Sequence, residues 1–250
     1  MAMPRVVTAE TLDHLAAADP AAQRSRRDLM RVHRAMGTRS IVARGWQALW
    51  PTPATLPRTV PGTSASPLKV LEIGAGDGTL LLAVARALAP TWPAVQLTLL
   101  DRQNIVSPAT LASYAELGWS ARAEVVDVLD WAAASASLAP SWDLITASLF
   151  LHHFKGAQLE RLISAIASRS QRFFACEPRR APLALAGSHL VGALGANAVT
   201  REDAVLSVHA GFRAHEVTEL WPGPGTAWQT HEYAAGLFSH CFSAQRTEAR

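Results

Sequence analysis

Apolar residues gather in short runs along the chain, and longer stretches of mixed polarity separate them. These runs are rich in Leu, Val, Ile and Phe, which is typical of strands that are buried on both faces of a parallel sheet. They occupy residues 68–73, 95–101, 123–129, 142–154 and 172–177. Five β-α repeats at this spacing predict an α/β fold with a doubly wound, mostly parallel sheet.

The last third of the chain is expected to complete this sheet with two more strands. Phe212–Trp221 and Trp228–Phe242 predict a sixth and a seventh strand, antiparallel to each other at the sheet edge. Before them, Pro182–Gly195 predicts an apolar helix, and Thr200–Asp203 has the pattern of a capping box for a helix that ends near Gly211. The sequence therefore predicts seven strands in all.

The first 50 residues differ from the rest in pattern and in charge. They contain eight arginines and four acidic residues, a net charge of +4, whereas the other 200 residues contain 15 basic and 16 acidic side chains. Helices are predicted at Thr8–Ala17, Ala21–Met36 and Ser40–Trp50, before a Pro-, Thr- and Ser-rich stretch. We expect an N-terminal helical lid at 1–50, a linker at 51–67 and the main domain at 68–250.

Three interpretations of the basic N-terminal helices are open. They could form a solvated layer on the main domain, or a lid in which His33 or an arginine contacts an acidic or phenolic substrate. The third interpretation, nucleic-acid binding, is disfavoured because no stretch interleaves basic and aromatic residues.

Composition narrows the class of protein further. A chain of 250 residues with 49% apolar residues can form one catalytic domain with additions. It has no apolar run of about 18 residues and no signal-peptide pattern, so we expect a soluble, cytoplasmic protein without a membrane span. Cys176 and Cys241 are too few for a disulfide framework, and no His/Cys cluster has metal-ligand spacing, so we expect no metal. A homodimer is left open.

A glycine-rich turn between the first strand and its helix predicts a cofactor site. The segment Val70–Leu80 reads VLEIGAGDGTL, with the glycines Gly74, Gly76 and Gly78 alternating with other residues. Such a turn brings the backbone close to a ligand. A dinucleotide fingerprint would need a third glycine or alanine where Thr79 stands, and the charge of Asp77 opposes a phosphate.

This turn closely resembles motif I of the class I S-adenosylmethionine-dependent methyltransferases. The resemblance covers about residues 66–245 and implies a Rossmann-like methyltransferase fold that binds S-adenosylmethionine. It also implies that Glu72 and Asp77 face the ammonium and sulfonium region of the cofactor, with Gly74, Gly76 and Gly78 beneath its methionine end.

Other cofactor-binding residues are expected at the ends of the following strands. Asp101 ends the second strand 23 residues beyond Gly78, where doubly wound folds place the carboxylate that binds ribose hydroxyls. The resemblance implies that Asp127 binds the adenine amino group, although Asp130 could fill that role. The remaining expected cofactor contacts are Arg102, Val128, Leu129, Ser148 and Leu149.

The chemistry of the acceptor is expected to fall to residues after the fourth and fifth strands. The segment that ends in Leu151-His152-His153 resembles the same segment of ubiquinone-methylase-type enzymes for small molecules. A neutral histidine can take the proton of a phenol, so His152 and His153 are candidate general bases, with Glu177 as a weaker alternative. Arg179, beside Arg180, is a candidate contact for an acidic acceptor, as is His33.

These expectations combine into one functional hypothesis. The resemblance implies methyl transfer to a small molecule, and we favour O-methylation of an aromatic, quinone-like or polyketide hydroxyl in secondary metabolism. The alternatives are C-methylation of a similar ring, or a cofactor-binding but non-catalytic partner subunit. An NAD-dependent oxidoreductase is disfavoured by Thr79 and by the lack of an S/Y-x-x-x-K pair.

Overall fold

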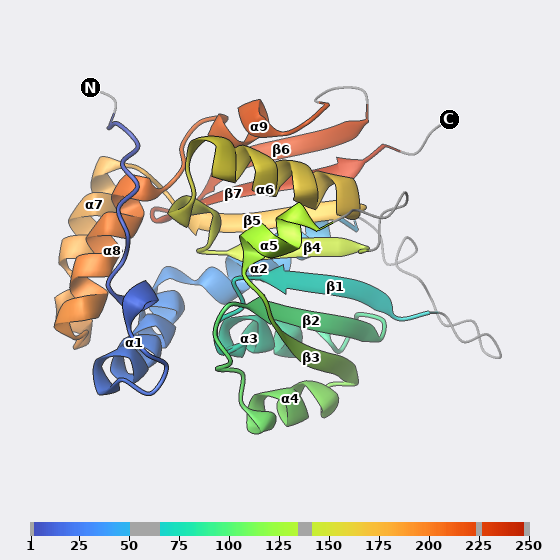
Figure 1. The fold of residues 1–250 in the computed structure, drawn as a ribbon, viewed down its shortest axis with the longest axis horizontal. Helices are drawn as coiled ribbons and strands as arrows, with labels where there is room; N and C mark the ends of the chain where they lie inside the picture. Colours follow the sequence, from blue (N-terminus) through green and yellow to red (C-terminus); the bar gives the residue numbers. More distant parts are fainter. Residues whose placement is uncertain (1–2, 51–65, 135–141, 224–226, 248–250) are drawn as a thin grey trace.

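A seven-stranded sheet forms the centre of the protein in the computed structural model, which describes residues 3–50, 66–134, 142–223 and 227–247 (Figure 1). The strands are β1 Leu68–Ile73, β2 Val95–Asp101, β3 Trp119–Val125, β4 Leu144–Ser148, β5 Arg172–Pro178, β6 Trp228–Ala235 and β7 Ser239–Arg246. Their order is β3-β2-β1-β4-β5-β7-β6. β1 to β5 are parallel, and β7 is antiparallel to both of its neighbours. The predicted fold class is confirmed.

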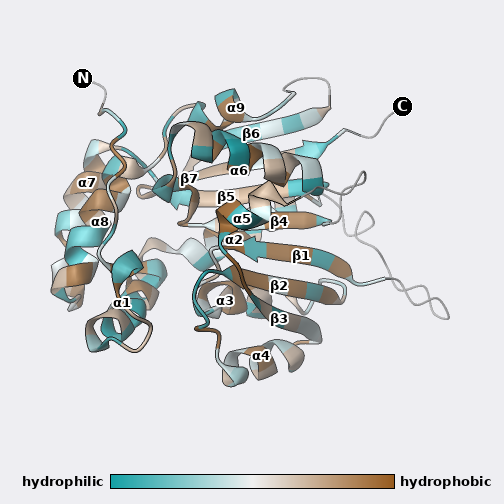
Figure 2. Ribbon diagram, in the orientation of Figure 1, coloured by the Kyte–Doolittle hydropathy of each residue, from teal (hydrophilic) through white to brown (hydrophobic). Residues whose placement is uncertain are grey.

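The order of the strands reverses at β1, which lies between β2 and β4. At the end of β1, Ile73 is opposite Leu100 of β2 and Ala147 of β4, so the carboxyl ends of three strands meet. Ligands of open α/β sheets bind outside this edge, where the strand order reverses. In Figure 2 the central strands β1, β2 and β4 are strongly apolar, while the edge strand β6 is paler and more polar.

Helices cover both faces of the sheet and enclose a hydrophobic cluster on each. One cluster includes residues of α2 Thr38–Ala48, α3 Thr79–Leu88 and α4 Pro108–Ala115. The other includes residues of α5 Val128–Ala133, α6 Gly156–Arg169 and α9 Glu216–Leu220. The strands β1, β2, β4 and β5 are therefore buried on both faces, which explains why they read as nearly continuous apolar runs.

Helix α2 belongs to this packed core although it comes from the N-terminal region. The indole of Trp46 is fully buried, and its Nε1 donates a hydrogen bond to Thr146 Oγ1 at 3.3 Å. A Cβ on Gly45 would lie 2.0 Å from the ring of Phe174 in β5, so the helix lies directly against the sheet. α2 is therefore a structural layer of the sheet domain.

A second group of helices stands beyond the carboxyl ends of the parallel strands (Figure 1). It consists of α1 Pro20–Met36, α7 Pro182–His189, the short 3-10 helix η4 Val191–Leu194 and α8 Ala198–Ala210. Asp19 caps the start of α1, and Gly37, with a φ of 69°, ends it. The segment before α1 runs past α8 and the sheet edge.

The prediction of a helix at Thr8–Ala17 was wrong. The structure has one 3-10 turn there, η1 Leu12–His14, and the backbone N–H groups of Thr11 and Leu12 donate to the carboxylate of Asp203 instead. Asp203 is thus a tertiary partner and not part of a capping box. The side chain of Asn197 caps α8 by accepting from the backbone N–H of Thr200.

Three strand predictions also need correction. The third strand is β3, which ends at Val125, because Asp127 caps α5 by accepting from Leu129 N at 2.8 Å. Residues 212–221 contain α9 in place of a strand, and residues 228–242 contain β6 and part of β7, joined by a hairpin. The apolar residues of these segments did not distinguish the strands from the helices α5 and α9 or from the hairpin between β6 and β7.

The predicted linker at 51–67 lies almost entirely outside the described residues, which resume at 66. Within the described ranges, none of the helices combines the length and the apolar character that crossing a membrane requires.

Candidate active site

A cavity of about 500 Å³ lies at the carboxyl ends of β1, β2 and β4. The glycine-rich loop after β1 and the loops after β2 and β4 form its floor, and α1 and the segment before α1 cover it. Most of the predicted site residues line it: Glu72, Gly74, Gly76, Asp77, Asp101, Arg102, Asp127, Val128, Leu129, Ser148, Leu149, His33, His152 and His153. Gly78 adjoins it through its neighbours Asp77 and Thr79.

The loop after β1 has the backbone shape that its glycines predict. Gly74, Gly76 and Gly78 all have positive φ, at 68°, 56° and 74°. A Cβ on Gly74 would also lie 2.1 Å from the ring of Phe150, so this position needs glycine for space as well as for conformation. Gly78 directly precedes α3, and its carbonyl accepts a hydrogen bond from Tyr114 Oη at 2.8 Å.

Glu72 carries an unsatisfied acidic group beneath the cavity. Its side chain is buried, and Oε2 has no hydrogen-bond partner among the described residues. Burial, with Asp101 and Asp77 nearby, raises the pKa of Glu72 well above its usual value. A cationic ligand next to this buried, unpartnered carboxyl group would favour its charged form and pair with it.

Asp101 joins the two loops on which a ligand would lie. Its carboxylate accepts hydrogen bonds from the backbone N–H groups of Gly76 at 2.8 Å and of Gln103 at 2.9 Å. Arg102 points to the N-terminal segment, where it donates to the carbonyl oxygen of Asp13. Asp127 lines the cavity and the alternative Asp130 does not.

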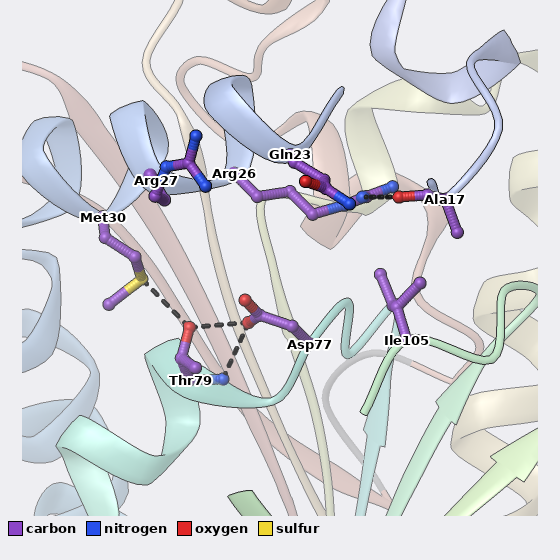
Figure 3. Close-up of a pocket in the computed structure, with 8 residues that line it drawn as sticks. All are labelled: Ala17, Gln23, Arg26, Arg27, Met30, Asp77, Thr79 and Ile105. Carbon is purple, nitrogen blue, oxygen red and sulfur yellow. Dashed lines mark hydrogen bonds between the residues drawn. The ribbon is translucent and has the colours of Figure 1, made fainter. Parts of the chain in front are cut away.

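Helix α1 lies directly over the glycine-rich loop and forms a second hollow of about 530 Å³ with it (Figure 3). The Oγ1 of Thr79 donates to Asp77 at 2.6 Å and lies 3.2 Å from the sulfur of Met30 in α1. Arg26 reaches across to Ala17 O and to Gln103 Oε1. The two hollows share the lining residues Arg26, Met30, Asp77, Thr79 and Ile105, so they lie next to each other.

Among the described residues of α1, His33 lines the cavity with a ring nitrogen that makes no hydrogen bond. Its Nδ1 is buried and has no hydrogen-bond partner there. Burial lowers the pKa of His33 to about 4, although Asp77 opposes the shift. The imidazole is therefore neutral at pH 7 and offers a free donor or acceptor to a ligand.

His152 is clamped between two carboxylates and cannot act as the neutral base that the sequence suggested. Its Nδ1 lies 2.8 Å from Glu177 Oε2, and its Nε2 lies 3.3 Å from Glu10 Oε1. Burial alone would lower the pKa of His152, but the two glutamates outweigh burial and raise it to about 9. The ring is protonated at pH 7, so it has no lone pair for a proton.

Glu177 holds the loop after β4 in place. One carboxylate oxygen accepts from the N–H groups of Phe150 and Leu151, and the other accepts from the N–H and the ring of His152. The residue before this loop, Leu149, has a φ of 55°, which is unusual for a non-glycine residue. Glu177 is almost fully buried, and its carboxylate oxygens are occupied by these donors, so it anchors the loop.

His153 is the histidine whose protonation state suits a general base. Its ring is 20% exposed and lines the cavity, and its Nδ1 lies 3.2 Å from Asp13 Oδ2. Burial, and next the charge of His152, lower the pKa of His153. The imidazole is neutral at pH 7 and accessible from the cavity.

Arg179 lies outside the site, contrary to the prediction. Its backbone N–H donates to Phe238 O and its guanidinium donates to Gly236 O, both near the turn between β6 and β7. The neighbouring Arg180 is buried and pairs with Glu216. The turn between β6 and β7 lies beside the end of β5 and binds Arg179, while Glu216 binds Arg180, so neither guanidinium lines the cavity.

Two acidic residues at the site were not predicted from the sequence. Glu10 contacts His152 and accepts from Ser207 of α8, and Asp13 contacts His153. Both lie in a segment that was expected to be an ordinary helix. The only sequence feature that could have indicated their role is the spacing of three residues between the two acids, and solvent-exposed helices commonly show the same spacing.

The ligand atoms of Glu10, His152 and His153 lie within 4.8 Å of one another, which is close enough to hold a metal ion. A metal bound here would have to replace a ring proton of His152, whose two nitrogens face Glu10 and Glu177. The expectation of a metal-free site stays a prediction.

Comparison with known proteins identifies a methyltransferase domain within the chain. Residues 71–170 match the family model described as a methyltransferase domain. The chain matches none of the curated proteins compared with it. Among solved structures it is similar to the plantazolicin methyltransferase BpumL in complex with SAH, at 14% identity over 92% of each chain and a TM-score of 0.60.

A second similar structure is an O-methyltransferase family protein from Burkholderia thailandensis. It has 14% identity, a TM-score of 0.57, and coverage of 93% of this chain and 62% of that one. At such identities these likenesses show the fold, while the family match shows a methyltransferase domain. Residues 71–170 therefore carry a methyltransferase domain, and the seven-stranded sheet, with its glycine-rich loop at the carboxyl end of β1, has the fold of these solved methyltransferases.

Proposed function

We propose that the protein transfers the methyl group of S-adenosylmethionine to a hydroxyl of a small aromatic, quinone-like or polyketide acceptor. The observation that carries this proposal is the continuity of one cavity, which joins the buried, unpartnered Glu72 at one end to the neutral His153 at the other. One end suits a cationic cofactor. The other suits an acceptor that must lose a proton.

The acidic residues and the glycine-rich backbone of the cofactor end support S-adenosylmethionine as its ligand. Glu72 and Asp77 would face its ammonium and sulfonium, Asp101 its ribose hydroxyls, and residues 127–129 its adenine. The glycine-rich loop leaves room for a ligand against the backbone. When bound, the cofactor supplies a methyl group that is already electrophilic, so the protein mainly has to align the acceptor and exclude water.

The acceptor end suits an aromatic alcohol. Phe150, Phe154, Leu12 and Leu29 give the cavity apolar walls, and His153 gives it a neutral imidazole. A phenol has a pKa of about 10 and is mostly protonated at pH 7, so a neutral imidazole helps to remove its proton. The neutral His33 is available to hydrogen-bond the same acceptor.

We also propose that the lid consists of residues 3–36 and not of the whole N-terminal region. Residues 8–14 and α1 line the cavity, whereas α2 packs beneath the sheet. A lid of this kind would exclude water from the acceptor once it is bound.

Mass spectrometry of products from labelled cofactor tests the proposed function. The full-length protein would be incubated with methyl-labelled S-adenosylmethionine and a panel of phenols, hydroxyquinones and hydroxylated polyketides. We expect the gain of one labelled methyl group on oxygen, with matched aliphatic alcohols unchanged. Label on a ring carbon would favour C-methylation, and cofactor binding without any product would favour the non-catalytic subunit.

A further inference from the structure

We infer that Asp13 is a positioning residue for His153, and that the N-terminal segment 3–14 must lie across the site for His153 to act as the base. This inference rests on the proposed function and adds a catalytic role for a segment far in sequence from the methyltransferase domain. It assigns different tasks to the two adjacent histidines.

The segment is tied to the loop that carries the histidines. The guanidinium of Arg5 donates to the carbonyl oxygens of His152 at 3.3 Å, Phe154 at 2.9 Å and Ala210 at 2.8 Å. Further along, the N–H groups of Thr11 and Leu12 donate to Asp203 of α8 at 2.8 and 3.0 Å. These hydrogen bonds hold the segment on both sides of Glu10, which lies between Arg5 and Thr11. They also hold Asp13, which directly follows Leu12.

Glu10, together with Glu177, keeps the ring of His152 protonated, which places a positive charge next to His153. Because both ring nitrogens of His152 face carboxylates, Glu10 on one side and Glu177 on the other, both must carry a proton. The rings of His152 and His153 are 4.2 Å apart between centroids. This imidazolium opposes protonation of His153 in the resting protein, so the lone pair of His153 remains available.

Asp13 selects the tautomer of His153. A carboxylate 3.2 Å from Nδ1 favours the proton on that atom, which leaves the lone pair on Nε2. Arg102 holds Asp13 in turn, through its carbonyl oxygen and through an ion pair of 3.6 Å. The charged groups around His153 are therefore His152, Glu10, Asp13 and Glu177.

The proton and electron balance of the step is simple. The acceptor oxygen forms a bond to the methyl carbon while the carbon–sulfur bond breaks and its electron pair stays on sulfur. The hydroxyl proton passes to Nε2 of His153, beside Asp13, and leaves to water after the product departs. No oxidant, reductant or metal is needed.

Kinetics of the full-length Asp13→Asn variant, with the phenol that the parent methylates best, tests the inference. We expect kcat at pH 7 to fall at least 10-fold, while KM and the affinity for S-adenosylhomocysteine change less than 3-fold. The loss should shrink as the pH approaches that of phenol ionisation, about 10. Asp13→Glu should recover part of kcat. The matched control is Asp130→Asn, an exposed acid outside the cavity.

The outcomes separate the inference from the proposed function. If the parent methylates a phenol but Asp13→Asn behaves like Asp130→Asn, or loses activity equally at all pH values, the inference fails. If a metal chelator abolishes the parent's activity and a divalent ion restores it, the proposed proton transfer to His153 without a metal is wrong. A parent that binds S-adenosylhomocysteine but methylates no hydroxyl overturns the proposed function itself.

Discussion

The two ends of the cavity are built in different ways. The cofactor end comes from short segments directly after β1, β2 and β3, and each segment brings its residues to the cavity within a few positions of its strand. The acceptor end joins the N-terminal segment, the loop after β4, the end of β5 and α8. The comparison indicates that the cofactor end is set by local backbone geometry and the acceptor end by long-range contacts between charged groups.

The largest expected effect tests whether His153, and not His152, takes the proton at the acceptor end. His153→Ala should lower kcat about 10²- to 10⁴-fold at pH 7, because the phenol then has to lose its proton without a base. The deficit should decrease toward pH 10, where the phenol ionises unaided. Binding of S-adenosylhomocysteine, measured by calorimetry, should be unchanged. Parental turnover in this variant would remove His153 from the mechanism.

His152 should matter first for stability. His152→Ala leaves two buried carboxylates without their shared cation, so the free energy of unfolding should fall by about 3–5 kcal/mol. Urea denaturation would measure this loss, with the exposed His189→Ala as the control. An unfolding free energy equal to that of the control would contradict the clamp between Glu10 and Glu177.

The stability that His152 provides should depend on pH in a defined direction. Its pKa is about 9 in the folded protein and about 6.5 when unfolded, so folding favours the protonated ring. This contribution, about 3 kcal/mol, should be complete below pH 6.5 and lost as the pH rises through 9. The difference in unfolding free energy between the parent and His152→Gln should therefore narrow between these values. A difference that widens with rising pH would show that folding does not raise the pKa of His152.

At the cofactor end, Asp101→Ala should weaken binding of S-adenosylhomocysteine by about 10- to 100-fold. The loss corresponds to charge-assisted hydrogen bonds of about 1.5–3 kcal/mol. Asp130→Ala is the control, because this carboxylate follows β3 but lies outside the cavity. Calorimetry that gave the two variants equal affinities would refute the role of Asp101, and tight NAD binding by the parent would refute the cofactor.

The smallest expected effect tests the boundary between core and lid. Gly45→Ala places a methyl group into the ring of Phe174, so it should lower the free energy of unfolding by about 1–3 kcal/mol despite the better helix propensity of alanine. Phe174→Leu in the same chain should recover part of that loss. If Gly45→Ala is as stable as the parent, α2 is not packed against β5 as described.

The contrast between the two ends also explains what the sequence could predict. Strands such as Val95–Asp101 and Arg172–Pro178 are buried on both faces, so their apolar runs are distinctive, and the glycines after β1 reveal the turn. Glu10 and Asp13 gave no comparable signal, because their partners are 142 and 140 residues away. The protonation states of His152 and His153 depend on those partners, so the sequence alone could not distinguish the two histidines.

The most direct test of the account is the dependence of kcat on acceptor pKa, measured at pH 7 for the parent and for His153→Ala with a series of substituted phenols. If His153 takes the proton within the cavity, kcat of the parent should vary weakly along the series, while kcat of the variant should rise steeply as the phenols become more acidic. The two lines should converge at the most acidic phenols. Parallel lines of equal height would contradict proton removal by His153, and the absence of methylated product along the whole series would contradict the hydroxyl acceptor.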